Sequence, residues 1–303
     1  MPTGIATNRS NISLPTEVAQ EIMQKTQQES VIMRLSRQIA LPGRGLTIPV
    51  ITGDPEAAWV AETGAKPVSN PSLSTKVMQA YKLAVIVPFS DEFRRDAAAL
   101  YDAIIARLPA ALAYKFDQTV LGVGDKPGEN FDNFANATAQ SLIAAGGNTT
   151  YKGLVNAFTD IAEHKGALNG FALSPAAEGI LLNATDSTGR PLFINSAADG
   201  AIPRVLGAPV VSSRAMYKAG AAPVGTGAGT PAVVGVAGDW TQAMYGTVEG
   251  VQIRFADQTG LTINSNQVNL WEHNMFAVRA EIEVGFRADT DCFDLLTGAV
   301  PQA

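Results

Sequence analysis

The chain is 303 residues long, with 46% hydrophobic residues, 17% charged residues and a formal net charge of −6. This length allows one large or two modest domains with a sizeable buried core. Tight, sequence-independent binding of nucleic acid needs clustered cations that neutralise phosphates, whereas this acidic chain has no dense run of Lys or Arg. Tight, sequence-independent binding of DNA or RNA is therefore disfavoured.

Three further features of the composition restrict the class of protein. Charged residues usually make up about 25% of a globular chain, so we expect much of this surface to be covered by copies of the same chain. The single cysteine, Cys292, excludes an intrachain disulfide, and two histidines leave little for a His-rich metal site. The sequence has neither the long apolar run of a membrane span nor an N-terminal signal peptide. We therefore expect no cofactor, and a cytoplasmic chain unless an assembly carries it elsewhere.

A polar arm with helical parts, residues 1–44, precedes a predicted hairpin over residues 45–88. Its second strand, "STKVMQAYKLAVIVPFS" from Ser74 to Ser90, is unusually long, because strands typically run about 5–6 residues. The stretch before it is rich in Gly, Pro, Ser and Asn and predicts a broad tip. Because a two-stranded ribbon alone is marginally stable in water, we expect the hairpin to lean on another surface.

Apolar residues that recur every four positions between Leu100 and Val120 predict a long helix over residues 97–121. Pro109 lies inside that stretch and predicts a kink, because proline removes one backbone donor. Gly122 is typical of a helix C-terminus.

The middle of the chain alternates between helix and strand, which predicts a compact α/β lobe. "TTYKGLVNAFTDIAEHKG", residues 149–166, predicts an amphipathic helix. Its apolar face is expected to hold Leu154, Phe158, Ile161 and Ala162. Ser174 and Pro175 predict the start of a second helix after the strand "GFAL", and "VLGAPVVSS" predicts a further strand.

The last third of the chain is mostly strand. "NMFAVRAEIEVGFRA", residues 274–288, alternates strictly and predicts a second long strand with one buried face. The apolar face consists of Phe276, Val278, Ala280, Ile282, Val284 and Phe286, and the charged face of Arg279, Glu281, Glu283 and Arg287.

No motif predicts a small-molecule enzyme. "GTGAGTP", residues 225–231, is followed by "AVVGV" rather than by the helix that a dinucleotide-binding loop needs. The carboxylates Asp125, Glu129 and Asp132 lack the spacing of a calcium loop and indicate a polar turn. Neither a Gly-x-Ser-x-Gly elbow nor an HExxH pair is present.

Five stretches in one order carry a resemblance to a known family: "WVAETGAKPVSNPSLSTKVMQAYKLAVIVPFSDEFRRDA", "FDQTVLGVGDKPG", "FALSPAAEGILLNATDSTGRPLF", "RVLGAPVVSS" and "NMFAVRAEIEVGFRADTDCFDLL". Together they span nearly the whole chain, which resembles the major capsid proteins of tailed bacteriophages. The resemblance implies the HK97-like capsid fold, of class α+β. Its parts would be an N-terminal arm (1–44), an extended loop (45–88), a peripheral domain (89–150 and 239–287) and an axial domain (151–238 and 288–303).

The resemblance also implies a function. The chain would assemble as hexamers and pentamers into an icosahedral shell that encloses double-stranded DNA without sequence-specific binding. It would work in the virion capsid after assembly in the bacterial host cytoplasm, with a portal, decoration proteins and no membrane. Because the sequence starts at Met1 with only a short arm, we expect scaffolding to come from a separate protein.

Some members of the family form an isopeptide bond between a loop lysine and an asparagine of a neighbouring subunit, with a glutamate as base. Lys76, Asn274 and Glu281 match these three positions. The plainer alternative is that Lys76 pairs with an acid across an interface and Glu281 pairs with Arg279 or Arg287 of a neighbouring subunit. The expected inter-subunit residues are Trp59, Glu62, Lys66, Lys76, Lys82, Arg94, Arg95, Arg279, Glu283 and Arg287.

Two other functions are weighed against the phage shell. An encapsulin-like nanocompartment shell shares the fold but should carry a cargo-binding helix near its N-terminus, where this chain has a polar arm. A soluble α/β enzyme would use the Gly-rich loop at 225–231 and needs a convergent polar site, which the sequence does not show.

Overall fold

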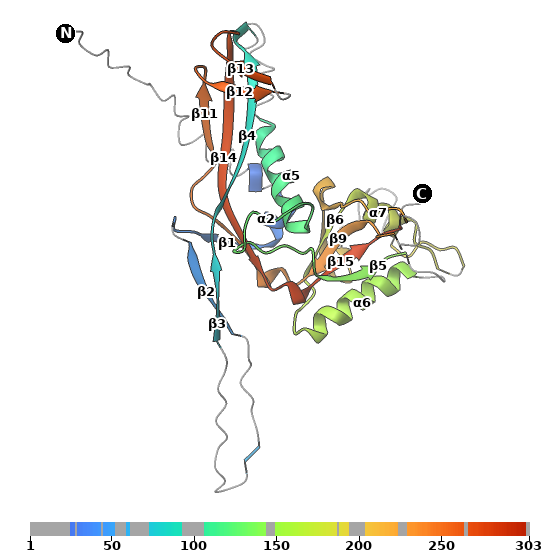
Figure 1. The fold of residues 1–303 in the computed structure, drawn as a ribbon. Coiled ribbons are helices and arrows are strands. Elements are labelled where there is room, and N and C mark those ends of the chain that lie inside the picture. Colours follow the sequence, from blue (N-terminus) through green and yellow to red (C-terminus); the bar gives the residue numbers. More distant parts are fainter. Residues whose placement is uncertain are drawn as a thin grey trace, which may run out of the picture.

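The computed structural model describes residues 25–27, 29–43, 45–51, 59–60, 73–92, 106–143, 149–186, 188–193, 204–223, 229–263 and 266–300. Two large β-sheets, a projecting two-stranded ribbon, a small two-stranded hairpin and several helices make up this part of the chain (Figure 1). None of the described helices has the length and apolar character that crossing a membrane requires.

The first sheet is built around β14 (Met275–Ala288), the long strand that the alternating pattern predicts. β4 (Tyr81–Ser90) pairs antiparallel with one edge of β14, from Met275↔Ser90 to Val284↔Tyr81. β11 (Gln252–Ala256) and β10 (Ala243–Thr247) pair with β14 in succession, and β1 (Arg37–Ala40) extends the sheet beside β10. All six predicted apolar residues of β14 are buried, which confirms the predicted face.

The predicted single strand over residues 74–90 is two strands. β3 (Leu73–Met78) ends before Gln79 and pairs with β2 (Leu46–Ile51) as a separate ribbon, whereas β4 joins the first sheet. The expected support for the second half of the hairpin is therefore a strand of the same chain. A small hairpin of β12 (Gly260–Ile263) and β13 (Asn266–Asn269) lies near the other end of β14 (Figure 1).

A pair of glycines explains where the strand breaks. Gly246 of β10 and Gly285 of β14 are paired in the sheet register. A Cβ at Gly285 would lie 2.5 Å from the backbone oxygen of Gln79, and one at Gly246 would meet the side chain of Leu41. The bare backbone of the two glycines therefore leaves room for the chain to cross the sheet between β3 and β4.

Helix α5 (Leu108–Leu121) confirms the second half of the predicted long helix, and residues 93–105 lie outside the described residues. Pro109 sits in the first turn, where a missing N–H costs nothing, so it marks the start of α5 and not a kink within it. Gly122 ends the helix with φ of 89°, as predicted.

Asp117 of α5 fixes the short helix α2 (Val31–Leu35) of the N-terminal arm. Its carboxylate accepts a hydrogen bond from the Ser30 hydroxyl at 2.5 Å and one from the Val31 N–H at 2.9 Å. Asp117 is fully buried, so its oxygens satisfy donors at the start of α2 that would otherwise be unpaired in the interior. The arm before residue 25 lies outside the described residues.

The second sheet has six strands in the order β5, β15, β9, β6, β8 and β7. In that order they are Thr138–Ser141, Phe293–Thr297, Val233–Gly238, Gly170–Leu173, Ala208–Ser212 and Arg204–Val205. Helix α6 (Thr149–Glu163) lies alongside β5 (Figure 1), and α7 (Pro175–Leu182) begins at Ser174, whose side chain caps it as predicted. The predicted strand "VLGAPVVSS" is instead a hairpin, because Leu206 and Gly207 turn the chain between β7 and β8.

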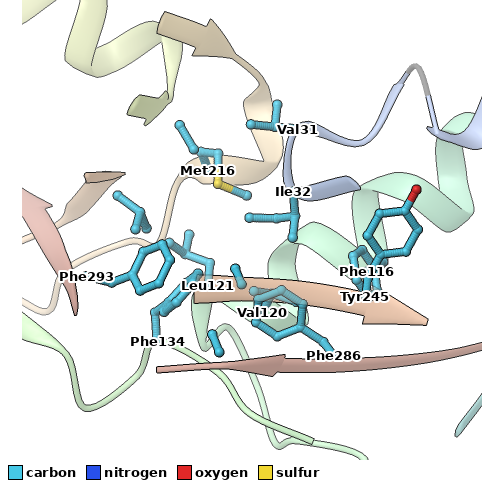
Figure 2. Close-up of a cluster of buried hydrophobic side chains, with 14 of the residues drawn as sticks. Val31, Ile32, Phe116, Val120, Leu121, Phe134, Met216, Tyr245, Phe286 and Phe293 are labelled. Atoms are coloured by element: carbon cyan, nitrogen blue, oxygen red, sulfur yellow. The ribbon is translucent and has the colours of Figure 1, made fainter. Parts of the chain in front are cut away.

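One hydrophobic core joins the two sheets (Figure 2). Tyr245 and Phe286 come from the first sheet, whereas Phe293 comes from the second. Phe134 lies between them, with its ring centroid 5.8 Å from that of Phe286 and 4.6 Å from that of Phe293. The described chain is therefore a single packed body from which the β2–β3 ribbon projects.

Candidate inter-subunit surfaces

The root of the ribbon is held to the first sheet by Arg287. Its guanidinium forms a salt bridge with Asp132 at 2.7 Å and donates to the backbone oxygen of Val77 at 2.6 and 2.8 Å. A further hydrogen bond reaches Asn130 at 2.9 Å, and only 11% of the Arg287 side chain is exposed. The planar fork of arginine suits this set of acceptors, so one side chain clamps β3, β14 and the 125–134 turn together.

Lys76 lies on β3, facing the same end of β14. Its amine donates to the backbone oxygen of Ala288 at 3.2 Å. Together with the Arg287 contacts, this hydrogen bond fixes the end of the ribbon that lies beside β14. The side chain of Val77 in the same strand is 40% exposed. The predicted interface residues Lys76 and Arg287 thus have contacts within their own chain at the ribbon root.

A charged face covers the middle of the first sheet. The Lys82 amine lies 3.1 Å from Glu281 and 3.2 Å from Glu283, and Arg279 lies 3.5 Å from Glu281. These hydrogen bonds raise the pKa of Lys82 and lower the pKa of Glu281. Arg254 and Glu249 complete an open, polar hollow over this face. Lys82 remains 68% exposed, so the face is available to a neighbouring chain.

The three residues expected for an isopeptide bond are far apart within one chain. Lys76 lies near Ala288 at one end of β14, and Asn274 lies just before the other end. A strand of 14 residues is about 45 Å long, so these two side chains meet only if they come from different subunits. Asn274 has φ of 50°, a left-handed conformation that asparagine tolerates better than most residues. Glu281 lies between them, and its lowered pKa is opposite in direction to what a general base needs.

Of the remaining predicted interface residues, the structure describes one, and the others lie outside the described residues. Trp59 is described and fully exposed. Glu62, Lys66, Arg94 and Arg95 lie outside the described residues.

Comparison with known proteins decides the family. The phage capsid family matches residues 11–289. The chain belongs to the phage capsid family.

Relatives of known name agree with this membership. A probable major capsid protein of Mycobacterium phage L5 is 29% identical, and the match covers 94% of this chain and 89% of the relative. The corresponding protein of Mycobacterium phage D29 is 27% identical over 95% of this chain and 90% of its own length. The major capsid protein of Staphylococcus phage 80alpha is 23% identical.

Solved structures agree on the fold. A chain from Gordonia phage Cozz superimposes with a TM-score of 0.70 at 22% identity, covering 90% of this chain and 87% of that one. The capsid of an empty GTA particle gives a TM-score of 0.61 at 15% identity over 99% of this chain and 95% of that one. The α+β, HK97-like fold is therefore confirmed, and the protein is a major capsid protein of tailed phages, a structural protein that self-associates in the virion. Neither the encapsulin nor the enzyme alternative is favoured.

Two parts of the capsid protein's surface chemistry were missed from the sequence. The spacing of Asp132 predicts only a polar turn, whereas in the structure its carboxylate forms the salt bridge with Arg287. The helical periodicity predicts Phe158 and Ala162 on the buried face of α6, but Phe158 is 50% exposed and Ala162 is exposed as well. The sequence gives no local signal for the pairing of Asp132 with Arg287. The two residues are 155 positions apart, and no spacing rule links an acid in a turn to an arginine on so distant a strand.

Proposed function

We propose that this capsid protein forms hexamers and pentamers of a closed icosahedral shell, in which the β2–β3 ribbon of each subunit lies on a neighbouring subunit. One observation carries the proposal: within the described chain, β2 and β3 pair only with each other. A two-stranded ribbon is marginally stable alone. A surface on the next subunit supplies what the ribbon lacks in its own chain.

The four-part division belongs to the same proposal. The first sheet with α5 corresponds to the peripheral domain, the six-stranded sheet to the axial domain, residues 1–44 to the arm and residues 45–88 to the extended loop. Three strands pair across these boundaries. β1, within the arm segment, joins the first sheet beside β10. β4, at the end of the loop segment, joins the first sheet, and β5, within residues 89–150, joins the second.

The partners and location follow from the shell. The shell encloses double-stranded DNA without sequence-specific contacts, which the acidic net charge of −6 supports. A separate scaffolding protein, a portal and decoration proteins complete the particle, which assembles in the bacterial host cytoplasm.

The first experiment is light scattering followed by negative-stain imaging of the purified chain, alone and with its scaffold. Closed particles of megadalton mass are expected. A monomer or dimer that stays unassembled with scaffold and crowding agent would contradict the proposal. A variant that lacks residues 46–78, and with them β2 and β3, should give no closed particles under any of these conditions.

Covalent joining of subunits is a separate prediction. The Lys76 amine would attack the Asn274 carboxamide of a neighbour, forming a C–N bond and releasing ammonia, with Glu281 of a third subunit as base. Within one chain Lys82 holds Glu281 ionised, so this chemistry requires Lys82 to release it in the shell. Mature particles that are boiled in denaturant should then give a ladder of oligomers that Lys76→Arg abolishes; a single band at 31.7 kDa would contradict crosslinking.

A further inference from the structure

Helix α6 leaves an apolar stripe uncovered. Its inner face buries Leu154 and Ile161 completely, but Tyr151 and Phe158 are 48% and 50% exposed. These two aromatic residues are seven positions apart, which places them two turns apart on one side of the helix with half-buried Val155 between them. We call Tyr151, Val155 and Phe158 the α6 stripe. The exposed parts of these side chains forgo the free energy of burying apolar surface, about 25 cal/mol per Å².

The β7–β8 hairpin places a second apolar side chain in solvent, at a cost in backbone conformation. Its two-residue turn consists of Leu206 and Gly207, with φ of 49° and 81°. Turns with two positive φ values favour Asn-Gly, because a branched side chain at positive φ costs about 1–2 kcal/mol. Leu206 adopts this conformation and is still 41% exposed. Folding of the free chain gains nothing evident from a leucine there, whereas a contact in an assembly would offset its cost.

The two features lie at opposite edges of one sheet. Helix α6 packs beside β5 and β15 at one edge of the sheet (Figure 1). The two strands of the hairpin, β8 and β7, form the opposite edge. Six strands separate these edges by about 24 Å. In a ring each copy presents one surface to the neighbour on one side and a different surface to the neighbour on the other side. Two complementary apolar features at opposite edges fit that requirement.

We propose that Leu206 at the tip of the β7–β8 hairpin packs against the α6 stripe of a second copy of this chain, joining six-stranded sheets head to tail around each capsomer. This contact rests on the proposed function and adds the residues that meet. A second copy is the occupant because the chain is a capsid protein whose neighbours in the shell are copies of itself. The contact is small, so it gains strength from repetition around a closed ring and leaves the free subunit monomeric.

The sharpest test is Leu206→Asn, because the contact and the fold respond to it in opposite directions. Asparagine suits the positive φ, so the free subunit should unfold at a higher temperature than the wild type. Loss of the leucine should lower the yield of closed particles at least tenfold. A rise in subunit stability with unchanged particle yield and unchanged shell disassembly in denaturant would overturn the proposal. A wild type that never forms particles would instead contradict the proposed function.

A cysteine pair identifies the partner surface. The native Cys292 is buried, so Phe158→Cys with Leu206→Cys adds the accessible thiols. Oxidised particles of this double variant should give a non-reducing gel ladder that reaches pentamers and hexamers and collapses with reductant. The matched control is Leu182→Cys with Leu206→Cys, since Leu182 at the end of α7 is 49% exposed but lies outside the stripe. A ladder in the control, or none in the test pair while particles form, would overturn the assignment.

Charge variants decide the case in which the cysteine pair blocks assembly. Phe158→Lys and Leu206→Glu should each reduce particle yield at least tenfold, and the double variant should recover most of it, because the two new charges attract across the contact. Equal yields in all three variants, or a double variant that is no better than either single one, would overturn the proposal.

Discussion

At the scale of single residues, Asp117 links the N-terminal arm to the body through a buried carboxyl group. Burial raises its pKa to about 7, although hydrogen bonds from Ser30, Val31 and Ile32 oppose the rise. Desolvation outweighs these hydrogen bonds because the carboxylate is wholly removed from water. The attachment of α2 therefore depends on a group that titrates near neutral pH.

This titration predicts how stability depends on pH. An unfolded aspartate loses its proton near pH 4, whereas Asp117 in the fold keeps it until about pH 7. The folded chain binds more protons between those values, so the free energy of unfolding should fall as pH rises from about 4 to 7 and level off above. Asp117→Asn should remove up to about 1.4 kcal/mol per pH unit from that slope in denaturant titrations.

The control for this experiment is Asp125→Asn, which changes an exposed carboxylate. It should keep the wild-type slope. Asp294, whose pKa burial also raises to about 7, contributes in the same direction in all three proteins. Slopes that are equal in the wild type and in Asp117→Asn would contradict the assignment to Asp117.

Cys292 predicts a second residue-level result. The thiol is buried, its pKa is raised to about 11 by burial and nearby aspartates, and its sulfur lies 3.6 Å from the His164 backbone oxygen. Because the thiolate is the reactive form, the native subunit should resist a thiol reagent at pH 8 and react once per chain in denaturant. Leu182→Cys should add one thiol that reacts in the native state; rapid native labelling of the wild type would contradict the burial of Cys292.

At the scale of elements, the glycine pair at the strand break controls where the ribbon leaves the sheet. Gly285→Ala would place a methyl group 2.5 Å from the Gln79 backbone oxygen, so the β3–β4 crossing must shift. We expect a loss of about 1–3 kcal/mol in the free energy of unfolding and a lower yield of particles. Chemical denaturation measures the first, and negative-stain counting the second. Gly250→Ala, which meets nothing within 4 Å, should leave both unchanged.

The elements also show how far a sequence predicts this fold. Alternation identifies β14, and Ser174 with Pro175 identifies the start of α7, because these signals are local. The break after Met78 is not visible locally, since it depends on glycines in strands far along the chain. The turn at Leu206 is hidden for a different reason: leucine is an unfavoured residue there, so propensity predicts a continuous strand.

The candidate surfaces follow the same division. Charged residues on β14 were predictable as one face, because side chains alternate along a strand. The partners of these charged residues within the chain were not predictable. Arg287 forms a salt bridge with Asp132, whereas Glu281 and Glu283 both form salt bridges with Lys82. Both outcomes depend on packing between segments that lie far apart in the sequence.

At the scale of the whole molecule, the shared core makes the two sheets one folding unit. Phe286 contacts Phe116 and Phe134, with ring centroids 6.2 and 5.8 Å apart (Figure 2). Its ring centroid also lies 6.1 Å from that of Phe131. Phe286→Ala should lower the free energy of unfolding by about 3–5 kcal/mol. Because the core is common, calorimetry and tryptophan fluorescence should report one transition that shifts as a whole. Tyr114→Ala, at a half-exposed site on α5, is the control, and two separate transitions would contradict a shared core.

Because Arg287 holds the ribbon at Val77, a rotation about that point would move the far end of the ribbon relative to the core. The fixed part is the core, the pivot is the Val77 backbone oxygen that Arg287 holds, and β3 extends from there to Leu73, four residues or about 13 Å away. A rotation of about 15° at the pivot moves the far end by about 3 Å, roughly the rise of one strand residue. If the ribbon lies on a neighbouring subunit as proposed, a small change of angle at one guanidinium would shift that contact by a full residue, and the same subunit would fit the different angles of the proposed hexamers and pentamers.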